Sequence, residues 1–477
     1  MTEYEPVIGL EVHCQLNTKT KIFCSCPTAF GAQPNTQVCP ICLGLPGVLP
    51  VLNQEALKSI IKAGLIFGSQ IASYSKFDRK NYFYPDLPKA YQISQYDLPI
   101  CLGGTVSIEM DGQARSIRLH RIHLEEDAGK LLHQDYSGHG SAVDYNRTGT
   151  PLIEIVSEPD LRSPKEAFEY LTSLKRNLKY LNISDCNMEE GSLRCDANVS
   201  VRPKGREKFG TRAEVKNMNS FHNVEKAIQF EIERQIESLE RGERVVQETR
   251  LWDPVKMETR TMRSKEEAHD YRYFPDPDLT PLKISKDFIE ELKKELPEAP
   301  HLRKDRFKVQ YSINDYDAGV LTSEKDIADF YEKACKGGGN AKSICNWIST
   351  ELLGSLKDSK TSIYSTKVKP LHISQLVQLI EQGKITGKTG KSIFQEMLST
   401  GNDPEKIVES QGLTQIQDTS EIEKIIEQVI QANPKPVEDF KAGKKNAVGF
   451  LVGQAMRLSK GKANPEIVQS ILVKKLS

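Results

Sequence analysis

The segment from Ile8 to Leu16 alternates with a period of two, and this pattern constrains the fold more than any other part of the chain. Its even positions are apolar, whereas its odd positions are glycine or polar. Such alternation is typical of a β-strand with one buried face. Glu11 and His13 should therefore point to the same side, away from the core. A carboxylate and an imidazole placed in this way could form half of a metal site, or they could simply belong to a solvated face.

The composition is that of a large globular chain. Its 477 residues are 38% apolar and 27% charged, enough for about two to four domains. The formal net charge of zero gives no overall field that would draw the chain to nucleic acid or to a membrane. The N-terminus lacks the apolar core of a signal peptide, and no apolar run is long enough to span a bilayer. Ten cysteines are too few for a disulfide scaffold, so we expect a cytoplasmic protein with reduced thiols.

Residues 1–293 are predicted to form a mixed α+β domain. Short strand-like segments, separated by loops rich in proline and glycine, fill its first half. Ser163, followed by proline and by Glu166, predicts the start of a helix over 163–180, and an apolar stripe predicts a second helix over 220–241. Strands often follow strands without a helical crossover, so we expect the sheet of this cradle-like domain to be antiparallel.

The rest of the chain is predicted to be helical. A Leu-Pro-Glu-Ala-Pro segment that ends at Pro300 marks the junction, and helical periodicity follows over 323–336 and 370–383. We expect an all-helical domain over 294–405 and a small helical tail domain over 406–477. The fold class is therefore α+β in the first domain, followed by two helical domains.

Four cysteines lie close together in the sequence as two pairs. Cys24 and Cys26 form the first pair, and Cys39 and Cys42 form the second. Two pairs of thiols at this spacing suit tetrahedral zinc, with two ligands from each loop. Four cysteine ligands would leave no open position, so the predicted zinc is structural. Alternatively, the four residues are free thiols.

Carboxylates are crowded into two further segments. The segment His123–Lys130 contains Glu125 and Glu126 beside Asp127, and such crowding is costly unless a cation offsets it. Glu154 lies inside an apolar, strand-like run, where an unpaired carboxylate would be costly if it pointed inward. The alternatives are an exposed acidic turn for the first segment and an edge strand facing water for Glu154.

The carboxylates and His13 together suggest one hard-cation site. Glu11, His13, one of Glu125 and Glu126, and Glu154 would offer mainly oxygen ligands, which suit Mg²⁺, Mn²⁺ or Ca²⁺ better than zinc. A hard cation is what a nucleoside triphosphate requires. No Walker A motif is present, since the Gly-Lys-Thr and Gly-Lys-Ser triplets lack the upstream glycine and a preceding strand.

Two segments rich in basic residues could contact phosphate. Within residues 76–96, Arg79 and Lys80 stand beside several aromatic residues and could hold phosphate oxygens, while the aromatics could stack on a base or simply pack. The last 38 residues hold eight Lys or Arg and one acid. This basic tail suits contact with an RNA backbone, or it could be a solvated basic helix. The candidate tRNA contacts are Lys444, Lys445, Arg457, Lys460 and Lys462.

Several long blocks of the sequence resemble one known family. The first reads Val-Ile-Gly-Leu-Glu-Val-His and ends at His13, and another reads Gly-Thr-Pro-Leu-Ile-Glu-Ile-Val-Ser-Glu-Pro-Asp and ends at Asp160. The chain closely resembles the B subunit of the bacterial tRNA-dependent glutamyl/aspartyl-tRNA amidotransferase. The matching blocks run through nearly the whole length and comprise residues 7–13, 76–86, 89–95, 125–130, 149–160, 188–198, 270–275 and 449–454.

The resemblance implies an ATP-dependent amidation in two steps. ATP would phosphorylate the side-chain carboxylate of Glu mischarged on tRNA(Gln), or of Asp mischarged on tRNA(Asn). Ammonia would then attack the acyl phosphate. The resemblance also implies two partners in a heterotrimer: an amidase-type A subunit that releases ammonia from glutamine and passes it through a channel, and a small C subunit that holds the other two together.

The resemblance also implies roles for particular residues. It assigns the catalytic Mg²⁺ to Glu11, His13, Glu126 and Glu154, and the choice of Glu126 over Glu125 rests on it alone. Mg²⁺ with Arg79 and Lys80 could neutralise the charge of phosphoryl transfer. The four cysteines resemble the zinc-bearing branch of the family.

Two other functions fit the residues alone. The first is a tRNA-binding scaffold without catalysis, in which the carboxylates are structural. The second is a metal-dependent nuclease acting on RNA, because clustered carboxylates also serve two-metal hydrolysis.

Overall fold

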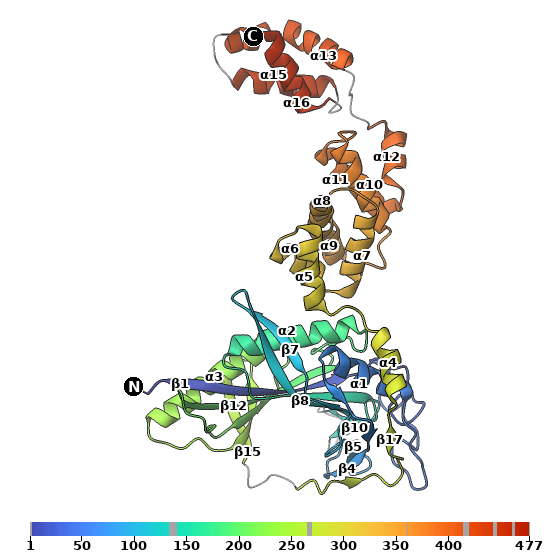
Figure 1. Ribbon diagram of the computed structural model, residues 1–477, viewed down its shortest axis with the longest axis vertical. Coiled ribbons are helices and arrows are strands. Elements are labelled where there is room, and N and C mark those ends of the chain that lie inside the picture. Colours follow the sequence, from blue (N-terminus) through green and yellow to red (C-terminus); the bar gives the residue numbers. More distant parts are fainter. Residues whose placement is uncertain are drawn as a thin grey trace. The chain divides into compact units, whose positions relative to one another are not determined.

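The structure is a computed structural model that describes residues 2–132, 141–264, 270–359, 361–413, 419–441, 446–459 and 463–476. It divides into two compact units, Met1–His301 and Leu302–Ser477, which are coloured blue to yellow and yellow to red in Figure 1. The predicted boundary at residue 293 lies shortly before this division. Each unit is described by itself below.

The first unit is built on a ten-stranded sheet with the order β15-β14-β13-β12-β1-β11-β8-β6-β2, in which β7 pairs with β8. Its strands are β1 (Tyr4–Gln15), β2 (Gln70–Ile71), β6 (Cys101–Leu102), β7 (Thr105–Met110), β8 (Gln113–Glu126), β11 (Pro151–Ser157), β12 (Leu193–Pro203), β13 (Ala213–Lys216), β14 (Glu248–Asp253) and β15 (Glu258–Ser264). The expected α+β class is confirmed.

The described pairs of this sheet are antiparallel except for β13 with β14. Between these two strands the chain forms the long helix α3 (Phe221–Glu240), and a parallel pair requires a crossover of this kind. The prediction of an antiparallel sheet therefore holds for the strands that adjoin β1, whereas the parallel pair was not anticipated.

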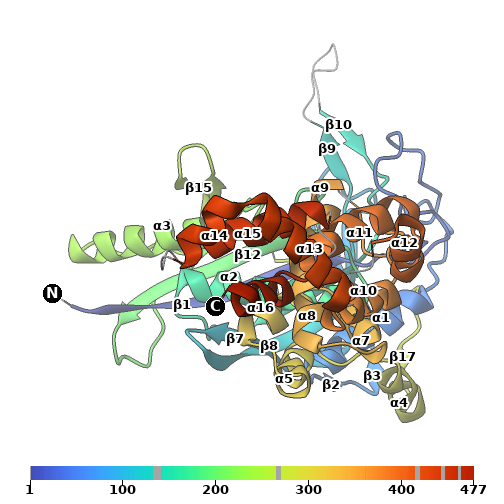
Figure 2. The same cartoon turned by 90° about the horizontal axis from the view of Figure 1, so that it is seen from above.

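Strand β1 lies inside the sheet, between β11 and β12, and its alternation separates the two faces. Ile8, Leu10, Val12 and Cys14 are buried in the main apolar core. The same core takes up the apolar stripes of α1 (Gln54–Ile66), α2 (Pro164–Tyr180) and α3. Figures 1 and 2 both show α2 and α3 running along one side of the sheet. The odd residues of β1 therefore project from the face opposite these helices, as expected.

Helices α2 and α3 begin at serine caps that the sequence shows. The Ser163 Oγ accepts a hydrogen bond from the backbone N–H of Glu166 (3.2 Å), so α2 begins where predicted. The Glu166 carboxylate does not complete the capping box with Ser163, because it accepts hydrogen bonds from the Arg162 N–H (2.7 Å) and from the Arg115 guanidinium. Helix α3 begins in the same way at Ser220.

The first unit also contains several short strands outside the large sheet. The three-stranded set β16-β4-β5 and the pairs β9–β10 and β3–β17 lie outside the large sheet. Figure 2 shows β9 and β10 extending away from the body of the unit. Their bounds, with the last helix of this unit, are β3 (Tyr74–Ser75), β4 (Asp78–Asn81), β5 (Tyr91–Ser94), β9 (Lys130–Leu132), β10 (Ala142–Asp144), β16 (Phe274–Pro275), β17 (Leu282–Lys283) and α4 (Lys286–Lys294).

The second unit is helical throughout its described part and contains two apolar cores. The first core is formed by α5 (Pro300–Tyr311), α6 (Asp315–Leu321), α7 (Lys325–Lys336), α8 (Ala341–Asn346), the π-helix Trp347–Leu352, α9 (Leu353–Ser359), α10 (Pro370–Glu381), α11 (Gly387–Thr400) and α12 (Pro404–Gln411). The second is formed by α13 (Thr419–Ala432), α14 (Pro434–Lys441), α15 (Asn446–Leu458) and α16 (Pro465–Leu476).

The segment around residue 405, where we expected the tail to begin, is helix α12. Its cap is Asp403, whose carboxylate accepts from the Glu405 N–H (3.0 Å). Ile407 and Val408 pack into the first of the two cores, so α12 groups with the helices before it. None of the described helices is both long and apolar enough to cross a membrane.

Candidate functional site

The register of three adjacent strands brings a row of ionisable side chains to the open face of the sheet. His13 on β1 lies opposite Glu154 on β11, and Glu154 lies opposite His123 on β8. Glu125 follows His123 by two residues and therefore points to the same side. Arg194 on β12 flanks His13 from the other side. Residues far apart in the sequence thus meet because opposite residues of antiparallel strands share a face.

Two imidazoles and two carboxylates form the centre of this row. The His13 Nε2 lies 3.5 Å from the Glu154 Oε2 and 3.7 Å from the Glu125 Oε1. The His123 Nε2 lies 3.3 Å from the Glu154 Oε2 and 3.5 Å from the Glu125 Oε2, which also accepts from Ser94 Oγ (3.1 Å). Ligand atoms of His13, Glu125 and Glu154 all lie within 4.8 Å of one another, a set that fits a hard divalent cation.

The four groups compensate one another in charge. Burial opposes ionisation, but Glu154 and Glu125 outweigh it and raise the pKa of His123 to about 9, and the pKa of His13 also lies above its usual value. The two imidazoles in turn hold the pKa of Glu154 well below its usual range and lower the pKa of Glu125. A proton on the His13 imidazole would have to leave when a cation binds, because a metal-binding imidazole is neutral.

Glu11 lies on the same face as His13, two residues earlier on β1. Its carboxylate accepts a hydrogen bond from Asn198 Nδ2 (2.9 Å). Burial, followed by the negative charge of Glu154, raises the pKa of Glu11. Glu11 does not belong to the compact set of ligand atoms, so it borders that set rather than completing it.

Glu126 lies on the opposite side of β8, and here the structure corrects the expected ligand set. Because side chains alternate along a strand, Glu126 points away from His123 and Glu125. Its carboxylate accepts hydrogen bonds from the Lys89 ammonium and from the Ile93 N–H (2.9 Å). Glu125, not Glu126, is the carboxylate of this segment that lies beside His13.

Arg79 and Lys80 also point in different directions, because they are neighbours on β4. Arg79 donates from Nε to Asp276 (2.8 Å) and from Nη2 to Asp278 (2.9 Å), so its guanidinium is already paired. Lys80 forms no ion pair with the residues that the structure describes. Burial lowers its pKa, but the carboxylates, Glu125 first among them, outweigh this effect and raise it. The Lys80 ammonium lies over the rings of Tyr271 (4.8 Å to the centroid) and Tyr82 (5.7 Å), within the electrostatic influence of Glu125.

A cavity of about 340 Å³ adjoins the cluster beyond Glu11. Glu11 and Asn198 border it on the cluster side, and its walls include Gly9, Phe209 and Arg212. The cavity combines an aromatic ring, a guanidinium and apolar strand residues. Such a lining can hold a flat apolar group and a negative charge at the same time.

A larger cavity of about 780 Å³ adjoins the cluster on the other side, beyond Gln15. Its lining includes Gln15, Arg147 and Arg194. The buried carboxylate of Asp127 fixes these residues, because it accepts from Gln15 Nε2 (2.6 Å) and Arg194 Nη2 (2.8 Å) and lies 3.7 Å from Arg147 Nε. The cation site thus stands between two cavities of different size and polarity.

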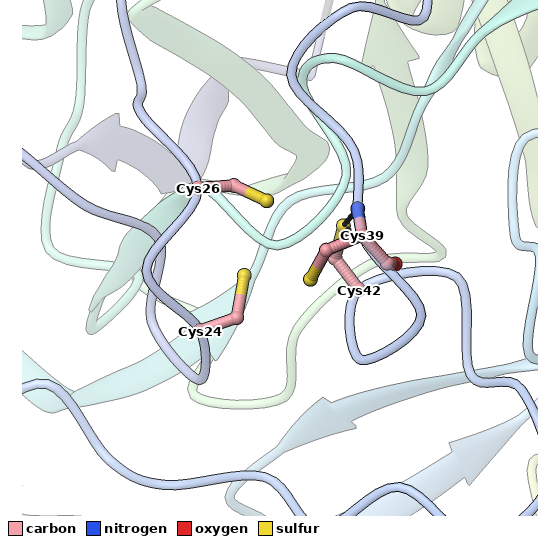
Figure 3. A group of neighbouring side chains, drawn as sticks. All are labelled: Cys24, Cys26, Cys39 and Cys42. Atoms are coloured by element: carbon pink, nitrogen blue, oxygen red, sulfur yellow. Dashed lines mark hydrogen bonds between the residues drawn. The ribbon is translucent and has the colours of Figure 1, made fainter.

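The four cysteines lie together on the first unit, as expected. Figure 3 shows Cys24 and Cys26 on one loop facing Cys39 and Cys42 on another. The sulfur atoms lie within 4.8 Å of one another, and a tetrahedral zinc–thiolate site requires separations of about 3.8 Å. Hydrogen bonds from Cys24 and from the Cys39 N–H lower the pKa of Cys42 to about 4. This arrangement fits a zinc ion held by four thiolates.

Comparison with known proteins identifies the family. The GatB/GatE catalytic domain matches residues 6–290, and the GatB domain matches residues 329–476. The chain belongs to the GatB family. It is 57% identical to the B subunit of the aspartyl/glutamyl-tRNA(Asn/Gln) amidotransferase of Carboxydothermus hydrogenoformans, with 100% of both chains covered. The proteins of the same name from Thermoanaerobacter pseudethanolicus and Geobacter sulfurreducens are 54% and 56% identical, with 100% and 99% of each chain covered.

The basic tail of this GatB chain is described only in part. Arg457 lies exposed near the end of α15. The other four expected tRNA contacts lie outside the described residues: Lys444, Lys445, Lys460 and Lys462. The prediction of a tRNA-binding tail therefore stays a prediction.

Sequence reasoning did not place His123 or the two cavities in the GatB site. His123 belongs to the acidic segment noted in the sequence. It precedes Glu125 by two residues, and this spacing on a strand could have predicted that the two side chains share a face. The cavity walls had no such signal, since Asp127, Arg147 and Arg194 meet only through the pairing of distant strands.

Proposed function

We propose that this chain carries the ATP-dependent amidation of Glu-tRNA(Gln) or Asp-tRNA(Asn), or of both. One observation carries the proposal: His13, Glu125 and Glu154 converge on the open face of the sheet, between two cavities. Relatives that match over the full length are named as B subunits of such an amidotransferase. Phosphoryl transfer needs two substrates that meet at a centre of positive charge, and a divalent cation held by these three residues would supply it.

We propose that the cavity beyond Glu11 takes the nucleotide. Phe209 offers a ring on which a base can stack, and Arg212 offers a cation for phosphate oxygens. The larger cavity beyond Gln15 then takes the aminoacylated end of the tRNA, for which its volume is ample. The terminal phosphate and the side-chain carboxylate would approach the cluster from opposite sides, as in-line transfer requires.

The chemistry would proceed in two balanced steps. A carboxylate oxygen of the aminoacyl side chain attacks the γ-phosphorus, ADP leaves, and an acyl phosphate forms. Ammonia then attacks the carbonyl carbon, the bond from that carbon to the phosphate oxygen breaks, and the departing phosphate takes up the proton that the nitrogen loses. Mg²⁺ bound by His13, Glu125 and Glu154 would neutralise the phosphate oxygens during transfer. Lys80 would balance the negative charge from the protein side, whereas Arg79 is engaged with two aspartates.

The names of the relatives motivate the partner proposal. We propose that an amidase-type A subunit supplies ammonia from glutamine, and that a small C subunit joins the two. The acyl phosphate would hydrolyse in open water, which favours internal delivery of ammonia. We also propose that the basic tail contacts the tRNA, with Arg457 as its described member.

Replacing Glu154 tests the proposal. The chain would be co-expressed with the A and C subunits and supplied with labelled Glu-tRNA(Gln), ATP, Mg²⁺ and ammonium chloride, without glutamine. The Glu154→Gln variant should lose product by about 100-fold or more, because it removes a charged ligand at the centre of the transfer. Glu158→Gln, which changes a carboxylate just beyond the same strand, is the matched control and should retain activity.

The same assay separates the alternatives. If the wild type formed no Gln-tRNA(Gln), and no Asn-tRNA(Asn) when supplied with Asp-tRNA(Asn) in place of Glu-tRNA(Gln), but still bound tRNA, the chain would be a scaffold. Cleaved tRNA without ATP consumption would instead indicate a metal-dependent nuclease. Equal activity of Glu154→Gln and the wild type would remove the cluster from the reaction.

A further inference from the structure

Lys21 is a buried lysine that has no carboxylate partner among the residues the structure describes. Its side chain has 0% relative exposure, and it is among the largest fully buried side chains of the described residues. The carboxylates that line the same cavity of about 190 Å³, Glu126 and Asp278, are bound to Lys89 and Arg79. A buried ammonium is costly unless an anion and hydrogen bonds compensate it.

The acceptors around the Lys21 ammonium indicate which group could serve as its anionic partner. Its Nζ donates to the backbone carbonyls of Gln37 (2.7 Å) and Tyr145 (3.5 Å) and to the Sγ of Cys42 (3.6 Å). Three donors thus meet three acceptors, as a lysine ammonium requires. The Cys42 sulfur also accepts from the Cys39 N–H (3.2 Å), so two donors converge on this one sulfur.

We propose that Lys21 is the counter-ion of the four-cysteine metal site, holding Cys42 as a thiolate ligand and tying it to the turn before β11. Four thiolates around a divalent zinc leave two negative charges in excess, and one buried ammonium offsets part of that excess. The inference rests on the proposed zinc site. It makes Lys21 a positioning residue, because Lys21 would act through Cys42 and would not contact the metal.

Backbone hydrogen bonds also connect the segment around Lys21 to the turn at Gly149. The Lys21 N–H donates to the Cys26 carbonyl (2.9 Å), so the same residue also contacts the first cysteine loop. The next residue, Ile22, donates its N–H to the Gly149 carbonyl (2.8 Å), and the Gly149 N–H donates to the Asp127 carbonyl (2.9 Å). Metal binding at the cysteines would therefore order the turn that leads into β11, the strand that bears Glu154.

Zinc affinity of the full-length chain tests the inference. Lys21→Met would be compared with Lys19→Met, which removes an exposed lysine two residues away, by competition with a chromophoric chelator. We expect Lys21→Met to bind zinc about 10- to 100-fold more weakly than the wild type, as for other residues that support metal ligands. Lys19→Met should bind zinc as the wild type does.

Thermal unfolding with and without zinc separates this role from ordinary packing. The ammonium has an anionic partner only when Cys42 is a thiolate, so Lys21→Met should lower the unfolding midpoint of the zinc-loaded protein and leave the chelated protein unchanged or more stable. Equal zinc affinity of Lys21→Met and wild type, or equal midpoint shifts in both states, would overturn the role of Lys21. A wild type that binds no zinc would overturn the zinc site itself, and the inference with it.

Discussion

The first unit contains two candidate cation sites that balance their charge in different ways. The cluster of His13, Glu125 and Glu154 includes imidazoles, which neutralise the carboxylates when no cation is bound. The four cysteines have no acid–base partner of this kind and depend on one lysine and on the metal. From this difference we expect the carboxylate–imidazole cluster to remain folded without a cation, whereas the cysteine loops should lose stability when their metal is removed.

The largest effect on the amidation rate is expected at Glu125, whose neighbour Glu126 lies on the other face of β8. Glu125→Gln should lower amidation with ammonium chloride by about 100- to 1,000-fold, roughly 3–4 kcal/mol, because a charged group at the centre of transfer is lost. Glu126→Gln should instead destabilise the fold, because it weakens the partner of buried Lys89. Turnover and thermal unfolding of both variants would check this. The reverse pattern would show that the strand register assigns the wrong residue.

Removing one thiol should affect folding more than chemistry. Cys39→Ser should release zinc and destabilise the first unit by about 2.7 kcal/mol, the gain from a ligand present at about 100 times its dissociation constant. Metal analysis and hydrogen exchange over residues 20–42 would measure both changes. Cys335→Ser in the second unit is the control and should leave the zinc content unchanged. Full zinc retention by Cys39→Ser would count against four-cysteine ligation.

The carboxylate–imidazole cluster should give a pH dependence when Mg²⁺ is absent. The pKa of His123 is raised to about 9, above its unfolded value, so its contribution is fully present below about pH 6.5 and is lost as the pH rises through 9. The free energy of unfolding should fall by roughly 3 kcal/mol over this window. Denaturant unfolding of wild type and His123→Gln would measure it, with His120→Gln, an exposed histidine of the same strand, as control. An equal fall in His123→Gln would assign the effect to other groups.

The smallest effect is expected at the neighbours Arg79 and Lys80. Lys80→Met should slow amidation by about tenfold, near 1.4 kcal/mol, because one cation within the electrostatic influence of Glu125 is lost. Arg79→Met should mainly reduce stability, because it leaves Asp276 and Asp278 without their partner. Steady-state rates and unfolding midpoints would distinguish the two. A slower Arg79→Met enzyme of unchanged stability would reverse this assignment.

The sequence predicted features that depend on local pattern. The alternation of β1, the cap at Ser163 and the two cysteine pairs were all readable within short segments, and the structure has each of them. Each depends on a period or a spacing that neighbouring residues set among themselves. The same local reading also predicted that Glu11 and His13 share a face.

The sequence failed where the answer depends on which distant strands are paired. Choosing between Glu125 and Glu126 required knowing which of them lies on the same face of the sheet as Glu154. The register of β8 with β11 decides this. Arg79 looked free for phosphate because its partners, Asp276 and Asp278, stand far along the chain. The parallel pair of β13 and β14 depended likewise on a crossover that strand patterns alone do not show.

The position of the cluster in the interior of the ten-stranded sheet has a consequence for the choice of amino acid. Aspartyl and glutamyl esters differ by one methylene group, and an enzyme for both must place either carboxylate at the same point. His13, Glu125 and Glu154 come from three adjacent, hydrogen-bonded strands, so they cannot shift independently to meet the shorter side chain. If the ester enters the cavity beyond Gln15 as proposed, the adjustment falls to the ester itself, because Asp127 also fixes Arg147 and Arg194.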